Sequence, residues 1–192
     1  MTIKHIREVR GLVNVSDMDN SFIFDLKYAT KDNFTKTVIY PVNVCVLQKE
    51  TAIKLINAKE EFKKLGYRIK IWDAYRPMYV QKIFWGIVGD ERFVANPNKK
   101  GSRHSCGTAV DITLVDEYDR ELKMPSDFDD FSEKSCRNYK GMNEEERKNI
   151  NFLTDVMKRH GFITIDTEWW HFDDSNYSKY EIIDVKLEYF IL

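Results

Sequence analysis

Apolar residues follow helical spacing in two long stretches of the sequence. Between residues 47 and 65 they recur every three or four positions, and Gly66 follows where a C-terminal cap is expected. A second stretch runs from Asn143, which has capping-box spacing to Glu146, as far as Gly161. The pattern predicts one amphipathic helix in each stretch.

Strict alternation marks the clearest strand. Residues 108–114 (TAVDITL) are rich in β-branched side chains, and alternation places three aliphatic residues on one face and Asp111 on the other. His104 lies seven positions before Asp111, an odd separation that a straight strand would place on the opposite side. We therefore expect the chain to bend at Gly107, so that both side chains reach the same side of the sheet.

Shorter segments complete the predicted fold. Further strands are expected at residues 22–26, 67–73 and 162–166, a helix from Pro77 to about Val88, and an edge strand in the tail that alternates from Val185. Residues 116–139 show neither helical spacing nor strand alternation, which predicts a long irregular segment. Because 192 residues suffice for one substantial core, we expect a single α+β domain over residues 1–192. Its centre would be a mostly antiparallel sheet with helices packed on it.

A second pair of polar residues also conflicts with strand alternation. Glu168 and His171 are three positions apart and share a face only on a helical turn or across a bulge. Residues 163–170 (ITIDTEWW) have strand composition, so we expect a bulge. His104 and Asp111 from one segment, with Glu168 and His171 from another, indicate a metal cage. Each histidine by itself would more often be structural.

Composition excludes several functional classes. Lys plus Arg (30) balances Asp plus Glu (31), which argues against nucleic acid and membrane surfaces as partners. The first twelve residues lack the apolar run of a signal peptide. Cys45, Cys106 and Cys136 have no paired spacing and predict free thiols. We therefore expect a cytoplasmic protein; the sequence does not address its oligomeric state.

Three motifs in order carry a family resemblance. They are WDAYRP (residues 72–77), SRHSCGTAVD (residues 102–111) and EWWHF (residues 168–172). With residues 25–35 and 126–131, they make the chain resemble the VanX-type D-alanyl-D-alanine dipeptidases over roughly residues 20–175. These are zinc metallopeptidases related to the D,D-carboxypeptidases. The resemblance implies hydrolysis of the small dipeptide D-Ala-D-Ala.

The resemblance also assigns roles to residues. It implies one Zn²⁺ per chain, at the sheet, with His104, Asp111 and His171 as ligands, Glu168 as catalytic base and Arg76 as the transition-state cation. The chemistry agrees, because two imidazoles and a carboxylate fill three tetrahedral positions and leave the fourth open for a water. Arg76 could instead only cap the preceding strand or pair with Asp73. If Arg76 is catalytic, we expect Asp73 to hold it in place. We expect Cys106 not to be a ligand.

The charged ends of a dipeptide indicate which residues bind the substrate. A dipeptidase must bind a free ammonium and a free carboxylate close to the metal. We expect Asp129 to face the ammonium, and Ser102 to bind the substrate or orient the site. Two alternatives stay open: a D,D-carboxypeptidase or peptidoglycan endopeptidase with the same chemistry, and a non-catalytic zinc-binding module. The sequence does not separate a role in glycopeptide resistance from recovery of alanine.

Overall fold

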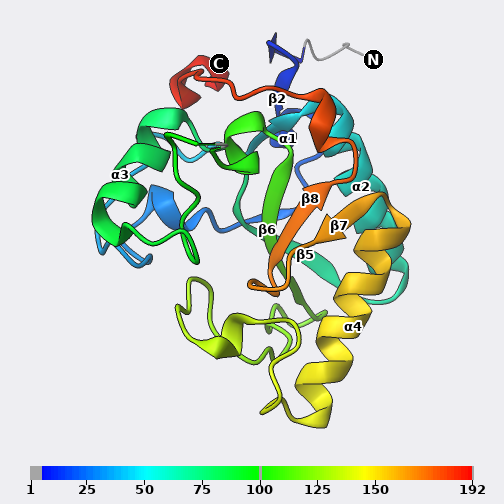
Figure 1. The fold of residues 1–192 in the computed structure, drawn as a ribbon. Helices are drawn as coiled ribbons and strands as arrows, with labels where there is room; N and C mark the ends of the chain where they lie inside the picture. The colour runs from blue at the N-terminus through cyan, green and yellow to red at the C-terminus, as the bar shows by residue number, and fades with distance from the viewer. Residues whose placement is uncertain (1–5, 100, 192) are drawn as a thin grey trace, which may run out of the picture.

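A five-stranded sheet runs through the centre of the protein (Figure 1). The computed structural model describes residues 6–99 and 101–191. In spatial order, the strands are β3 (Ile23–Phe24), β5 (Arg68–Asp73), β6 (Ala109–Val115), β8 (His171–Asp174) and β7 (Phe162–Thr164). β3 pairs in parallel with β5, and the other three pairs are antiparallel. The predicted α+β class with a mostly antiparallel sheet is confirmed.

Two long helices lie together beside this sheet. α2 (Lys49–Lys64) and α4 (Glu144–Arg159) share one apolar core with the sheet, and in Figure 1 both lie to its right. α4 begins with the predicted capping box, in which the Asn143 side chain accepts from the Glu146 amide and the Glu146 side chain accepts from the Asn143 amide. α3 (Met78–Val88) lies on the opposite side, to the left in Figure 1.

A smaller antiparallel sheet supports the predicted bend at Gly107. It contains β1 (Glu8–Val9), β2 (Leu12–Asn14) and β4 (Val46–Gln48), and the short helix α1 (Val15–Met18) follows β2. The Gln48 amide donates to the Gly107 carbonyl at 2.8 Å. Gly107 has a φ of +72°, which favours glycine.

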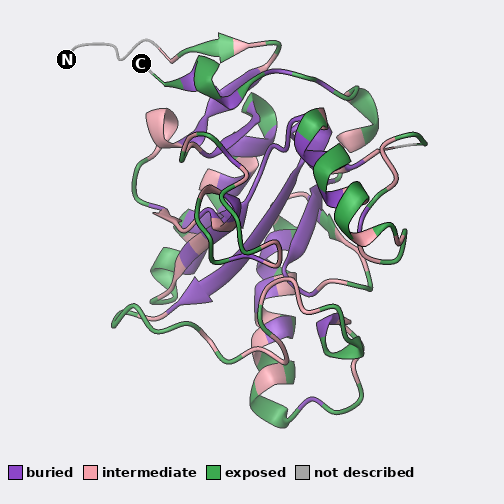
Figure 2. Cartoon of the chain, turned by 90° about the vertical axis from the view of Figure 1, so that its left-hand side faces the viewer, coloured by how far each residue is buried: buried purple, intermediate pink, exposed green. Residues whose placement is uncertain are grey.

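β6 is buried along its whole length (Figure 2). Val110, Ile112 and Leu114 belong to the apolar core that includes residues of α2 and α4. Alternation turns Asp111 to the other face of the sheet, as predicted. A buried strand with a carboxylate on one face needs polar partners for that carboxylate, and these partners form the site described below.

Loops and 3₁₀ turns make up the rest. The turns are Lys27–Ala29, Arg103–Cys106, Glu133–Ser135, Tyr177–Lys179 and Leu187–Phe190. Residues 116–142 are irregular apart from one of these turns and a bridge residue, as predicted. All three cysteines are free thiols. Within the described ranges, no helix has both the length and the apolar character needed to cross a membrane.

Two strand predictions were wrong. The strand expected over residues 163–170 ends at Thr164, and a loop over residues 165–170 replaces the expected bulge. The tail forms no strand, because its backbone bonds to a side chain: the Tyr75 hydroxyl lies 2.9 Å from the Ile183 carbonyl and accepts from the Val185 amide at 2.8 Å. Val185 and Leu187 are buried in an apolar cluster with Tyr75, whereas Tyr189 and Ile191 are exposed.

The bend at Gly107 generates a stability prediction. In Gly107→Ala, the added methyl would overlap the Leu12 side chain, lie 3.2 Å from the Gln48 amide nitrogen, and require a left-handed backbone. We expect the free energy of unfolding to fall by more than about 1 kcal/mol, measured by urea denaturation.

Gly86→Ala is the matched control. Gly86 lies in α3 with open space around its Cα, so alanine should raise the free energy of unfolding by about 0.5–1 kcal/mol. Equal effects of the two substitutions would contradict this account of Gly107.

Candidate active site

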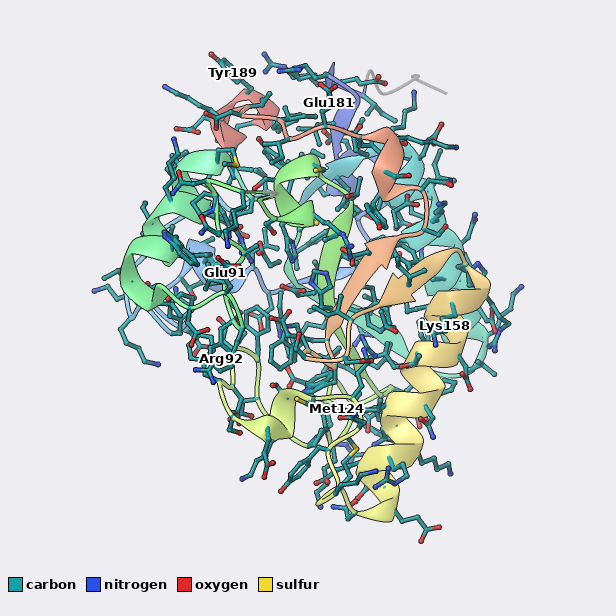
Figure 3. The ribbon with its side chains drawn as sticks, in the orientation of Figure 1. Glu91, Arg92, Met124, Lys158, Glu181 and Tyr189 are labelled. Carbon is teal, nitrogen blue, oxygen red and sulfur yellow. The ribbon has the colours of Figure 1, made fainter. Side chains whose placement is uncertain are left out.

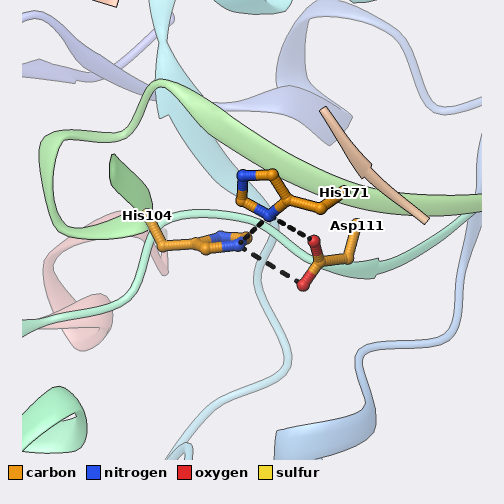
Figure 4. A group of neighbouring side chains, drawn as sticks. All are labelled: His104, Asp111 and His171. Atoms are coloured by element: carbon orange, nitrogen blue, oxygen red, sulfur yellow. Dashed lines mark hydrogen bonds and ion pairs between the residues drawn. The ribbon is translucent and has the colours of Figure 1, made fainter. Parts of the chain in front are cut away.

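Three buried side chains converge on one point beside the sheet (Figure 4). His104 comes from the Arg103–Cys106 turn, Asp111 from β6 and His171 from β8. His104 Nε2 lies 3.2 Å from His171 Nδ1, and the two Asp111 oxygens lie 3.0 Å from His171 Nδ1 and 3.4 Å from His104 Nε2. The structure therefore brings together all three predicted metal ligands.

Backbone geometry explains this convergence. Asp111 and His171 are directly opposite each other in the β6–β8 ladder, so their side chains project from the same face. The turn before Gly107 returns His104 to that face, and the Ser102 side chain caps this turn by accepting from the His104 amide at 3.2 Å. The odd spacing of His104 and Asp111 is thus resolved at the predicted residue.

The hydrogen bond made by the outer nitrogen of each ring fixes which nitrogen carries the proton. His104 Nδ1 lies 2.6 Å from the Ala74 carbonyl, and His171 Nε2 lies 2.9 Å from Asp173 Oδ1. A carbonyl and a carboxylate only accept hydrogen bonds, so these two nitrogens carry the protons. When both rings are neutral, His104 Nε2 and His171 Nδ1 consequently present lone pairs to each other and to Asp111.

This donor set fits a tetrahedral metal ion. Ligand atoms at about 2.0–2.2 Å from zinc are separated from one another by about 3.3–3.6 Å, close to the 3.0–3.4 Å seen here. Without a cation, three acceptors face one another. Accordingly, although burial opposes it, hydrogen bonds with Asp111 and Asp173 raise the pKa of His171 to about 10. Burial likewise opposes ionisation of Asp111, yet the two imidazoles hold its pKa below the usual range.

Glu168 lies beside the ligands, in the loop between β7 and β8. Its Oε2 is 3.7 Å from His171 Nδ1, and its side chain is 24% exposed. Burial, followed by the negative charge of Asp111, raises the pKa of Glu168 against the opposing effect of His171. Trp169 and Trp170, the last two residues of this loop, are buried, and the Trp169 indole donates to Ser126.

Arg76 is buried and held in a fixed orientation. Its Nη2 and Nε atoms donate to one oxygen of Asp73 at 2.6 and 3.2 Å, and Nη1 donates to Gln81 at 3.0 Å. Tyr40 donates to the other Asp73 oxygen at 2.6 Å. The predicted Asp73–Arg76 pair is therefore present, within a wider network. Arg76 also lines the cavity described below.

Asp129 faces the same cavity. It has a φ of +59°, and its carboxylate accepts from the Tyr28 hydroxyl at 3.0 and 3.1 Å. Burial and the nearby charge of Asp111 raise the pKa of Asp129 to about 8. Among the described residues, no lysine or arginine forms an ion pair with Asp129, so its carboxylate is suited to an incoming positive charge.

These residues line one cavity of about 740 Å³. Its wall includes Arg76, Ser102, His104, Asp111, Asp129, Glu168 and His171. Glu91 and Arg92 border it from the segment after α3, and Glu181 borders it from the tail; Figure 3 labels these three residues. All seven residues predicted for the site therefore share one cavity, whereas Cys106 does not join the three-residue cluster.

Sequence reasoning missed several contacts at this site. Asp173 could have been found, because it lies two residues after His171 on a strand and so shares its face. No motif or periodicity in the sequence points to Tyr28, Tyr40 or Gln81. Their hydrogen-bond partners at the site are between 5 and 101 positions away in sequence.

Comparison with known proteins agrees with this geometry. A family model described as D-ala-D-ala dipeptidase (Peptidase_M15) matches residues 8–187. The chain belongs to this family. A D-alanyl-D-alanine dipeptidase of Escherichia coli (strain K12) is 32% identical over 180 residues, covering 94% of this chain and 93% of the relative. One of Enterococcus faecalis (strain ATCC 700802 / V583) is 33% identical over 182 residues, covering 84% and 90%.

A solved structure is also similar. The LdcB LD-carboxypeptidase is 19% identical, with a TM-score of 0.46, covering 88% of this chain and 69% of that one. Membership of the dipeptidase family makes this protein a metallopeptidase. The family therefore favours an enzyme over the non-catalytic zinc-binding module that the sequence had left open.

The raised pKa of Asp129 predicts a pH dependence in this metallopeptidase. In the unfolded chain an aspartate titrates near about 3.9, so the stabilising contribution of protonated Asp129 is complete below that pH and is lost as pH rises through about 8. After removal of divalent metal by a chelator, the wild type should lose more stability between about pH 4 and pH 8 than Asp129→Asn does. Urea denaturation across this range measures the difference.

Asp127→Asn provides the control, because Asp127 is exposed and only two residues away. Its pH profile should follow the wild type. Parallel profiles for wild type and Asp129→Asn would contradict the assignment.

Proposed function

We propose that this metallopeptidase hydrolyses the dipeptide D-Ala-D-Ala, with one Zn²⁺ per chain held by His104, Asp111 and His171. The observation that carries the proposal is the convergence of three electron-pair donors, 3.0–3.4 Å apart, in a cavity that also holds Glu168. Relatives at 32–33% identity over most of the chain are named D-alanyl-D-alanine dipeptidase, which supports this substrate.

Zinc chemistry suits this donor set. When bound, Zn²⁺ supplies a Lewis acid and lowers the pKa of a coordinated water to about 7. Glu168 takes a proton from the attacking water and then passes it to the departing amine nitrogen. It lies 3.7 Å from His171 Nδ1, and burial raises the pKa of its carboxyl, which favours holding the transferred proton.

Arg76 stabilises the negative charge that develops on the substrate's carbonyl oxygen. Its guanidinium is fixed by Asp73 and Gln81, so little reorganisation is needed when that charge appears. The aromatic rings of Tyr28 and Phe84 flank it, with the guanidinium carbon 5.4 and 4.8 Å from the ring centroids.

Substrate length follows from the two ends of the dipeptide. We assign the ammonium group to Asp129, whose carboxylate has Tyr28 as its hydrogen-bond donor. The Ser102 hydroxyl accepts from the His104 amide and keeps its own proton free to donate to the substrate. Three free thiols are compatible with action in the cytoplasm, which we also propose.

A cleavage panel tests the substrate. Purified protein with zinc should release alanine from D-Ala-D-Ala and leave a pentapeptide stem intact, because Asp129 requires a free ammonium near the metal. A chelator should abolish release, and added Zn²⁺ should restore it. Mass spectrometry of products measures both substrates. Cleavage of the pentapeptide without cleavage of the dipeptide would refute the dipeptidase and favour the carboxypeptidase or endopeptidase.

Two substitutions test the mechanism. Glu168→Gln should fold, retain one zinc per chain and lose activity by at least about 10²-fold, because the proton acceptor is removed. His171→Ala should lose both zinc and activity. Metal analysis after dialysis, alongside turnover, separates the two. Wild-type turnover in Glu168→Gln would disprove its role as base.

A further inference from the structure

Asp173 lies directly behind one of the proposed zinc ligands. It is fully buried, at 0% exposure, on the same strand and the same face as His171. Its Oδ1 atom accepts from His171 Nε2 at 2.9 Å. This bond keeps the proton on the outer nitrogen and directs the Nδ1 lone pair into the site.

The second oxygen of Asp173 forms an ion pair with Arg103 Nη1. The Arg103 side chain is 38% exposed, and its guanidinium carbon lies 4.0 Å from the centroid of the Tyr177 ring. The guanidinium is therefore held between a carboxylate and an aromatic ring. Neither Arg103 nor Tyr177 is needed by the mechanism proposed above.

The position of Arg103 gives this pair a further consequence. Arg103 immediately precedes His104 in the turn that supplies one ligand, whereas Asp173 and His171 belong to β8. The ion pair thus ties together the two segments that carry the imidazoles, 70 residues apart in sequence. A ligand histidine whose outer nitrogen is bound by an anchored carboxylate cannot rotate without breaking that bond.

We propose that Asp173 is a positioning residue for the metal centre and that Arg103, stacked on Tyr177, holds Asp173 in place. The proposal rests on the proposed function, since it assumes a metal at His104, Asp111 and His171. Asp173 orients His171 and fixes its tautomer. Arg103 acts only through Asp173 and so fixes the distance between the two ligand-bearing segments.

Zinc affinity distinguishes this role from a purely structural ion pair. His171 and Arg103 bond different oxygens of Asp173, so in Asp173→Asn an NH2 donor must face one of these two donors. We expect the dissociation constant for Zn²⁺, measured by competition with a chromophoric chelator, to rise about tenfold to a hundredfold. Arg103→Gln should raise it less, by about tenfold. The double variant should bind zinc no more weakly than Asp173→Asn, because the two residues act in series.

Asp174→Asn is the matched control. Asp174 is equally buried on the same strand, but it is bonded to Thr51 and Lys54 of α2. Its loss should lower the free energy of unfolding and leave zinc affinity within about twofold of wild type. Stability measured on the same samples shows that each variant is folded. Should Asp173→Asn fail to fold, the half-exposed Arg103→Gln still tests the proposal.

The positioning role would be overturned if folded Asp173→Asn bound zinc as tightly as wild type. If Asp173→Asn does not fold, wild-type zinc affinity in Arg103→Gln would overturn it. Additive weakening in the double variant would overturn the claim that Arg103 acts through Asp173. His171→Ala separates these results from failure of the proposed function: if it too binds zinc as tightly as wild type, the metal centre itself is wrong.

Discussion

The site depends on three electron-pair donors that face one another and need a proton or a cation between them. His104 Nε2, His171 Nδ1 and the Asp111 carboxylate are buried within 4.8 Å of one another. The outer ring nitrogens, His104 Nδ1 and His171 Nε2, donate their protons to the Ala74 carbonyl and to Asp173. Such an arrangement is repulsive unless a proton or a metal cation lies between the donors, so the fold must hold the three side chains together. The sheet register and the turn at Gly107 provide that constraint.

Much of this constraint was predictable, because it is local. Alternation along β6 placed Asp111, the spacing to His104 required a bend at a glycine, and the Asp73–Arg76 pair spans three residues. What the sequence failed to predict depends on distant partners. The loop over residues 165–170 deviates from strand geometry where the Trp169 amide donates to the Ser135 carbonyl. In the tail, the Val185 amide donates to the Tyr75 hydroxyl. No local propensity contains that information.

Charge balance connects the site to its proposed ligands. Asp73 and Asp173 each pair with an arginine. In the part of the chain that the structure describes, neither lysine nor arginine forms an ion pair with Asp111, Asp129 or Glu168, although all three line one cavity. Burial, and after it the negative charge of Asp111, raises the pKa of both Asp129 and Glu168.

Bound cations would relieve the repulsion between these carboxylates. A divalent cation beside Asp111 and an ammonium beside Asp129 would each remove part of it, so the cavity favours a ligand that carries positive charge next to a metal ion. A peptide with a free N-terminus beside its scissile bond has this arrangement, whereas a long stem peptide carries its ammonium far from the bond. The same carboxylates therefore support the proposed preference for a dipeptide over a long stem peptide.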